Sequence, residues 1–207
     1  MHYHQYHELL ENNERWIEEK LATSPDYFQK LAEGQRPPYL FIGCSDSRMP
    51  LNSFTKTEPG ELFIHRNVAN QVSLTDMNLL AVLEYAVESL QVQHIVICGH
   101  YCCGGVEAAY KGTATGVVEN WITPIRDLYL TNKTAIDALP EAERLNRLAE
   151  LNVVEQVKNI CKTSVMHRAF QAGSAPQVHG WVLDIAHGRI KDLQLPMDSW
   201  KQLGIVP

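Results

Sequence analysis

The sequence predicts an α/β fold with a mostly parallel central β-sheet flanked by helices. Short apolar runs that are typical of buried strands alternate along the chain with longer segments of helical periodicity. The expected strands are residues 39–44, 62–65, 94–98 and 178–185. Because strands and helices that alternate in this way form parallel units, the pattern favours a parallel sheet.

The segments between these strands predict the flanking helices. The apolar residues of 75–90 recur at helical spacing and give the strongest helix prediction. Further helices are expected at residues 104–110, at 118–129, and from Pro140 to about Cys161 with interruptions. Past the turn signal His187-Gly188, residues 190–195 are able to pair back as an antiparallel edge strand at the C-terminus.

The first 35 residues predict a helical arm ahead of an α/β core of residues 36–207, and the 207-residue chain is expected to be one domain. Residues 7–21 have a rough amphipathic pattern. Ser24-Pro25 is expected to cap a second helix over residues 26–32, with proline at its first position.

Composition excludes several classes of protein. A formal net charge of −6 gives no basic excess for binding nucleic acid or an anionic membrane. No apolar run reaches the ~18–20 residues of a membrane span, and the N-terminus is too polar for a secretory signal, so we expect a cytoplasmic protein. The five cysteines are an odd number, which argues against a disulfide framework and points to metal binding or catalysis.

Cysteine and histidine residues follow two of the predicted strands. Cys44 ends the first strand, while His100, Cys102 and Cys103 follow the strand at 94–98. Adjacent parallel strands bring such loops to the same edge of a sheet. Thiolate sulfur and imidazole nitrogen are zinc ligands, and three protein ligands leave a fourth position for water, as in catalytic sites. The sequence therefore predicts a catalytic metal site at this edge.

Three longer motifs contain these residues: Cys44-Ser45-Asp46-Ser47-Arg48, His65-Arg66-Asn67-Val68-Ala69-Asn70 and Gly99-His100-Tyr101-Cys102-Cys103-Gly104-Gly105. In order and spacing they resemble the motifs of the β-carbonic anhydrase family, and the resemblance covers nearly the whole chain. It implies a parallel core sheet, an N-terminal arm that takes part in dimerisation, and a homodimer or homotetramer. It also implies the reversible hydration of carbon dioxide to bicarbonate and a proton by zinc-bound hydroxide.

The resemblance assigns roles to individual residues. It implies one zinc ion per chain, held by Cys44, His100 and Cys103, with Asp46 and Arg48 as a catalytic pair. Cys102 competes with Cys103 for the ligand role, and we keep Cys103 because the family spacing is His-x-x-Cys. Asp46 would block the metal as a fourth ligand, whereas a two-point bond to Arg48 would hold it away and let it orient the metal-bound water.

Two further sites are implied less directly. By resemblance, Gln35 and Phe63 line a small apolar pocket for carbon dioxide, and Gly104 opens a helix whose N-terminus favours an anion such as bicarbonate. Arg66 corresponds to one member of a second, non-catalytic bicarbonate site in some bacterial relatives. Its two partners there are replaced here by Phe41 and Leu183, which lack their hydrogen-bonding groups, so we expect weak or absent bicarbonate inhibition.

Three alternatives remain open on the sequence. A hydrolase for carbonyl sulfide or carbon disulfide would share the zinc site and the Asp46–Arg48 pair. A non-catalytic zinc or anion-binding scaffold would not need that pair. A redox protein using Cys102-Cys103 is disfavoured because adjacent cysteines form strained disulfides and no Cys-x-x-Cys motif is present.

Overall fold

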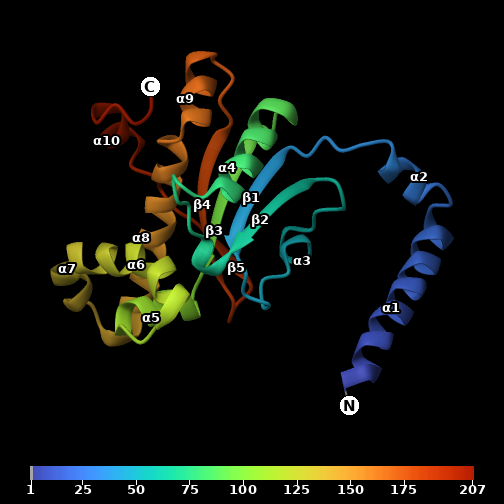
Figure 1. Cartoon of the computed structure of the whole chain (residues 1–207), viewed down its shortest axis with the longest axis horizontal. Helices are drawn as coiled ribbons and strands as arrows, with labels where there is room; N and C mark the ends of the chain where they lie inside the picture. The colour runs from blue at the N-terminus through green and yellow to red at the C-terminus, as the bar shows by residue number, and fades with distance from the viewer. Residues whose placement is uncertain (1) are drawn as a thin grey trace. The chain divides into compact units, whose positions relative to one another are not determined.

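The computed structural model describes residues 2–207, which divide into two units, one ending at Gln35 and the other comprising Arg36–Pro207. The first unit consists of α1 (His2–Thr23) and α2 (Tyr27–Ala32), drawn in blue in Figure 1. No helix within the described residues combines the length and the apolar character that a bilayer crossing requires.

Aromatic side chains hold the two helices of the first unit together. The Trp16 ring meets Phe28 edge-on with 5.1 Å between ring centroids, and the Lys20 ammonium lies 5.0 Å from the centre of the Tyr27 ring. The prediction that Ser24 caps α2 was wrong. The Ser24 N–H bonds to the Lys20 carbonyl and so ends α1, which leaves Asp26 as the residue before α2.

The second unit is built on a five-stranded sheet in the order β2-β1-β3-β4-β5, which confirms the predicted fold class (Figure 1). Its first four strands are parallel, and β5 is antiparallel to β4. The strands are β1 (Tyr39–Cys44), β2 (Leu62–Asn67), β3 (His94–His100), β4 (Gln177–Asp184) and β5 (Arg189–Asp192). Strand β2 is longer than predicted because its register with β1 continues until Asn67 lies opposite Cys44.

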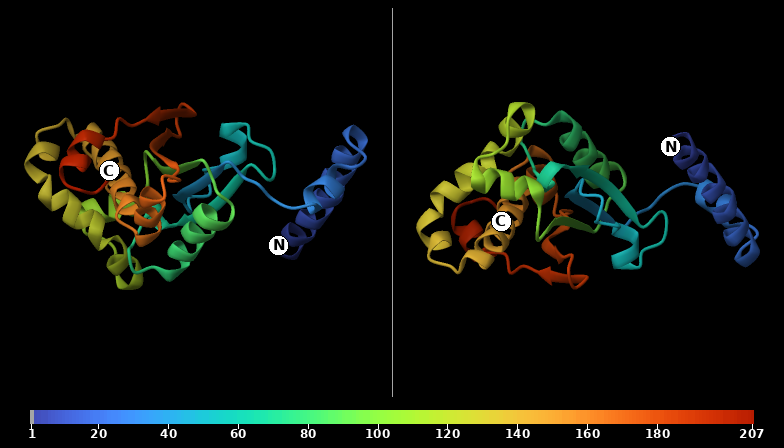
Figure 2. Two further views of the ribbon diagram at one scale, coloured as in Figure 1. Left: turned by 90° about the horizontal axis from the view of Figure 1, so that it is seen from above. Right: turned by 90° about the horizontal axis from the view of Figure 1, so that it is seen from below.

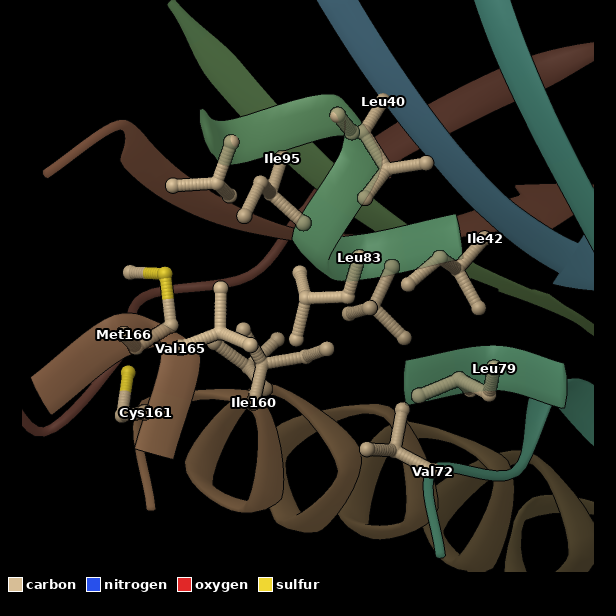
Figure 3. Packing of buried hydrophobic residues seen from close by; sticks show 14 of the residues in the cluster. Leu40, Ile42, Val72, Leu79, Leu83, Ile95, Ile160, Cys161, Val165 and Met166 are labelled. Atoms are coloured by element: carbon tan, nitrogen blue, oxygen red, sulfur yellow. The ribbon is translucent and has the colours of Figure 1, made fainter. Parts of the chain in front are cut away.

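Helices pack on both faces of this sheet. On one face Leu40, Ile42 and Ile95 contact side chains of α4 (Met77–Glu84), the second half of α8 (Glu141–Cys161) and α9 (Ser164–Gln171), as Figure 3 shows. On the other face Phe41 and Val96 lie in a second core, to which α3 (Leu51–Thr55) contributes Leu51 and Phe54 and to which four further helices, seen together beside the sheet in Figure 2, also contribute. These are α5 (Gly104–Lys111), α6 (Gly116–Thr131), α7 (Lys133–Asp137) and the first half of α8.

Two predicted helices differ from those observed. Residues 75–90 form α4, which Asp76 caps through a bond from the Asn78 N–H, and then a π-helical turn, Tyr85–Ser89. Helix α8 runs without the expected interruptions, because its polar residues Asn152 and Gln156 bond to buried groups instead of breaking it. Four helices were not predicted: α3, α7, α9 and α10 (Met197–Gln202).

Candidate metal centre

The carboxyl ends of β1 and β3 lie side by side and bring three metal-binding side chains together. Cys44 ends β1, His100 ends β3, and Cys103 precedes the first residue of α5. All three are buried, and one ligand atom from each lies within 4.8 Å of the others. We call these three side chains the Cys-His-Cys cluster.

The geometry of the cluster fits a tetrahedral zinc ion. The two sulfur atoms, Cys44 Sγ and Cys103 Sγ, are 4.0 Å apart. Two thiolates on one zinc ion at ~2.3 Å each are separated by about 3.8 Å. His100 Nε2 is buried without a hydrogen-bond partner. Its Nδ1 lies 2.9 Å from the Tyr101 carbonyl, which can only accept, so Nδ1 carries the proton and Nε2 has a free lone pair for a metal.

The two thiols share one negative charge. A hydrogen bond from the Cys103 thiol, opposed by burial, lowers the pKa of Cys44. The Cys44 thiolate and burial in turn raise the pKa of Cys103. A concentration of negative charge in a buried place is what a divalent cation would neutralise.

Asp46 and Arg48 form an ion pair at the edge of the cluster. The Arg48 backbone N–H and Nε both donate to Asp46 Oδ1 at 2.9 Å, and Arg48 Nη2 donates to Oδ2 at 2.7 Å. These bonds hold the pKa of the Asp46 carboxyl well below its usual range, despite partial burial. Asp46 Oδ2 lies 3.6 Å from His100 Nε2. The carboxylate therefore stays ionised and faces the cluster while Arg48 holds both of its oxygens.

Arg66 supports the loop that follows β1. Its Nε and Nη2 donate to the Cys44 carbonyl at 2.9 and 2.7 Å, and Nη2 also donates to the Asp46 carbonyl at 2.7 Å. The guanidinium thus bonds the backbone at a cluster residue and at the ion pair. A role for Arg66 in a second anion site stays a prediction, and Phe41 and Leu183 are buried in the core on one face of the sheet.

Cys102 differs from Cys103 in position and exposure. Its side chain is exposed, and its backbone has a φ of +58°, a left-handed conformation that non-glycine residues rarely adopt. The Cys102 carbonyl accepts a bond from Arg48 Nη2 at 3.1 Å. Cys102 therefore contacts the ion pair through its backbone, while the Cys103 thiol faces Cys44.

The three residues expected to bind substrate lie in different surroundings. Phe63 packs at the margin of the core with its ring centroid 5.8 Å from that of Tyr85. Gln35 is exposed at the end of the first unit. Gly104 is exposed at the start of α5, and a Cβ atom added there would meet nothing within 4 Å. Substrate binding by these residues stays a prediction.

Close packing beside His100 makes Gly99 intolerant of a larger residue. A Cβ atom on Gly99 would lie 2.7 Å from Val153 Cγ2 and 3.2 Å from Asn70 Oδ1. We expect Gly99→Ala to lower the free energy of unfolding by about 1–3 kcal/mol, because the neighbouring side chains must shift. Urea denaturation would measure this loss. Gly104→Ala is the matched control, and an equal loss in both variants would contradict the explanation.

Glu150 on α8 joins the residue after His100 to β5. Its carboxylate accepts bonds from the Tyr101 hydroxyl and from Lys191 Nζ, both at 2.7 Å, and from Arg147 Nη1 at 3.3 Å. Local sequence patterns do not indicate this group, because Lys191 and Tyr101 lie 41 and 49 positions from Glu150 along the chain. Burial raises the pKa of Glu150, but the bonds from Lys191 and Tyr101 outweigh it and the net pKa is lowered.

This lowered pKa predicts a pH-dependent contribution to stability. Above the unfolded pKa, near 4.5, the folded state keeps the Glu150 carboxylate paired, and this stabilisation is lost as pH falls through the lower folded value. We expect wild-type protein to be more stable than Glu150→Gln at pH about 7, with a difference that narrows below pH about 4.5. Urea denaturation at several pH values would show it. A difference that stayed constant with pH would contradict the assignment.

Comparison with known proteins places these features in a family. The family model described as carbonic anhydrase matches residues 39–190. A carbonic anhydrase of Emericella nidulans is 45% identical over 188 residues, which cover 90% of this chain and 82% of the relative.

Solved structures agree with this assignment. A β-carbonic anhydrase from Sordaria macrospora, described as tetrameric, has 42% identity and a TM-score of 0.87, covering 92% of this chain and 97% of that one. A β-carbonic anhydrase of Aspergillus fumigatus has 36% identity and a TM-score of 0.90, covering 98% and 99%. These comparisons do not favour a hydrolase for carbonyl sulfide or carbon disulfide over a carbonic anhydrase. The chain therefore belongs to the β-carbonic anhydrase family and is an enzyme of that family.

Proposed function

We propose that this enzyme catalyses the reversible hydration of carbon dioxide to bicarbonate and a proton, with one zinc ion per chain held by Cys44, His100 and Cys103. The main support is the convergence of three buried ligand atoms, one of them an imidazole nitrogen with no partner. Thiolate and imidazole are ligands that suit zinc, and three protein ligands are typical of its catalytic sites.

The residues around the cluster supply the remaining chemistry. When bound, zinc acts as a Lewis acid that lowers the pKa of a water molecule and so makes a nucleophile available near neutral pH. Asp46 is ionised and can only accept, so it would accept a hydrogen from that water and so orient it toward carbon dioxide. Arg48 holds Asp46 by bonds to both oxygens and so keeps the carboxylate from acting as a ligand itself.

We also propose that the chain assembles with further copies of itself, as a dimer or tetramer. Strand β2 forms one edge of the sheet, and Ile64 within it and Val68 directly after it are about 40% exposed. An exposed apolar edge strand is a surface that proteins usually cover. The Sordaria relatives are described as tetrameric. Sedimentation velocity would test this, and a mass of one chain would contradict it.

The activity is tested by measuring zinc content together with carbon dioxide hydration in a stopped-flow instrument. We expect about one zinc ion per chain and hydration that is lost on chelation and restored by zinc alone. Carbonyl sulfide offered to the same preparation is the comparison substrate. Metal-free protein that retained full hydration activity, or faster turnover of carbonyl sulfide than of carbon dioxide, would contradict the proposal.

A further inference from the structure

The turn that follows β2 has an unusual backbone. Within Val68–Asn70, Ala69 has a φ of +59° and Asn70 a φ of +49°. Two consecutive non-glycine residues in the left-handed region are unfavourable and persist only where surrounding contacts hold them. We call Val68–Asn70 the left-handed turn. Ala69 and Asn70 are both almost fully buried.

This turn contacts all three segments that supply the Cys-His-Cys cluster. Ala69 lies in the same buried cluster as Cys44 and Cys103. The Cβ of Ala69 lies 3.0 Å from the place where a Cβ would stand on Gly105, two residues after Cys103. The Asn70 side chain covers Gly99, the residue before His100. The position of this turn therefore bears on the position of each cluster residue.

Buried amides bond the left-handed turn to helix α8. The Ala69 carbonyl accepts bonds from Asn152 Nδ2 at 3.1 Å and from Gln71 Nε2 at 2.9 Å. Asn152 Oδ1 in turn accepts from Gln71 Nε2 at 2.8 Å and from Gln156 Nε2 at 3.0 Å. Gln156 Oε1 accepts from the Val72 N–H at 2.7 Å. Asn152 thus bonds to Ala69, to Gln71 and to Gln156.

The three amide side chains of this hydrogen-bond network are buried. Asn152, Gln156 and Gln71 have exposed fractions of only 1%, 3% and 4%. A buried amide is unfavourable unless it is hydrogen-bonded, and apolar residues in these places would pack in a core without that requirement. The amides of Asn152 and Gln71 instead donate hydrogen bonds to the Ala69 carbonyl and so stabilise the unfavourable backbone conformation of the left-handed turn.

We propose that Asn152 is a positioning residue for the metal centre, which it acts on through the left-handed turn. By bonding the Ala69 carbonyl, Asn152 holds the turn against the segments of Cys44, Cys103 and His100. The inference rests on the metal site proposed above. Groups that orient metal ligands in this way typically change metal affinity by 10–100-fold when they are removed.

The test compares Asn152→Ala with Val157→Ala, which removes buried volume from the same helix at a residue that bonds to neither the turn nor the cluster. Zinc dissociation constants come from competition with a chelator. The absorption spectrum of the cobalt-substituted protein reports the thiolate-to-metal bonds directly. Thermal unfolding of each variant shows how much stability it has lost. Gln71→Met, of similar volume, is a second variant that removes one donor to Ala69.

We expect Asn152→Ala to bind zinc about 10–100-fold more weakly and to change the cobalt charge-transfer band. Gln71→Met should change the zinc affinity and the cobalt band in the same direction. Val157→Ala should unfold at a lower temperature but keep the parental zinc affinity and cobalt spectrum. Parental affinity and spectrum in both amide variants would overturn the inference alone, as would an equal loss of affinity in Val157→Ala. A parent protein that binds neither metal would overturn the proposed function, and this inference with it.

Discussion

Asp46→Asn is expected to keep its zinc and to hydrate carbon dioxide at least ~100-fold more slowly than the parent enzyme. The amide has no charge and presents a donor where the carboxylate only accepts, so it orients the attacking water poorly and bonds Arg48 at one point only. Cys44, His100 and Cys103 are unchanged, and metal binding therefore remains. Stopped-flow kinetics and zinc content measured on the same sample would show the two effects separately.

The matched control for this variant is Glu107→Gln on α5. It makes the same change from carboxylate to amide near Cys103, but Glu107 is exposed and pairs with Lys111. We expect parental rates from it, since an exposed pair of this kind contributes little. Equal rates in Asp46→Asn and the parent would exclude the role assigned to Asp46. A loss of zinc in that variant would show that Asp46 serves the metal directly.

Cys103→Ser is expected to lose bound zinc and, with it, carbon dioxide hydration. The cluster would keep only Cys44 and His100, and a serine hydroxyl is a much poorer zinc ligand than a thiolate. Zinc affinity by chelator competition should fall by more than ~100-fold, beyond what removing a supporting group causes. Hydration rates at saturating zinc would then measure any activity that remains.

Cys102→Ser is the control that the sequence itself provides, one residue away. Its thiol is exposed, and only its backbone carbonyl bonds to Arg48, so serine should preserve both zinc and turnover. If Cys102→Ser lost zinc while Cys103→Ser retained it, the two cysteines would have to exchange roles. Loss in both variants would indicate that the loop, rather than one sulfur, determines binding.

Much of the fold could be predicted because it depends on local patterns. The continuous apolar runs identified four strands of a parallel sheet, and the order of strands implied that the loops after Cys44 and after β3 meet at one edge. Strand ends that lie beside each other in the sheet bring the Cys44, His100 and Cys103 ligand atoms within 4.8 Å. Strand order and the spacing of the two motifs were enough to predict that these ligand atoms lie close together.

Other features could not be predicted, because they depend on residues far apart in the chain. Asn152 bonds to Ala69 across 83 positions, and nothing in the local sequence indicates this contact. The positive φ angles of Ala69 and Asn70 could not be predicted, because neither residue is a glycine. The π-helical turn after α4 occurs within a sequence whose apolar spacing fits an ordinary helix. In each case tertiary contacts outweighed the local preference of the chain.

The most direct test of the central claim is X-ray absorption at the zinc edge of the purified enzyme. A zinc ion held by Cys44, His100 and Cys103 with one position open to solvent has two sulfur neighbours at ~2.3 Å and two nitrogen or oxygen neighbours at ~2.0–2.1 Å. We expect that pattern, and we expect one sulfur to disappear in any zinc that Cys103→Ser retains. Four sulfur neighbours, or none, would contradict the account.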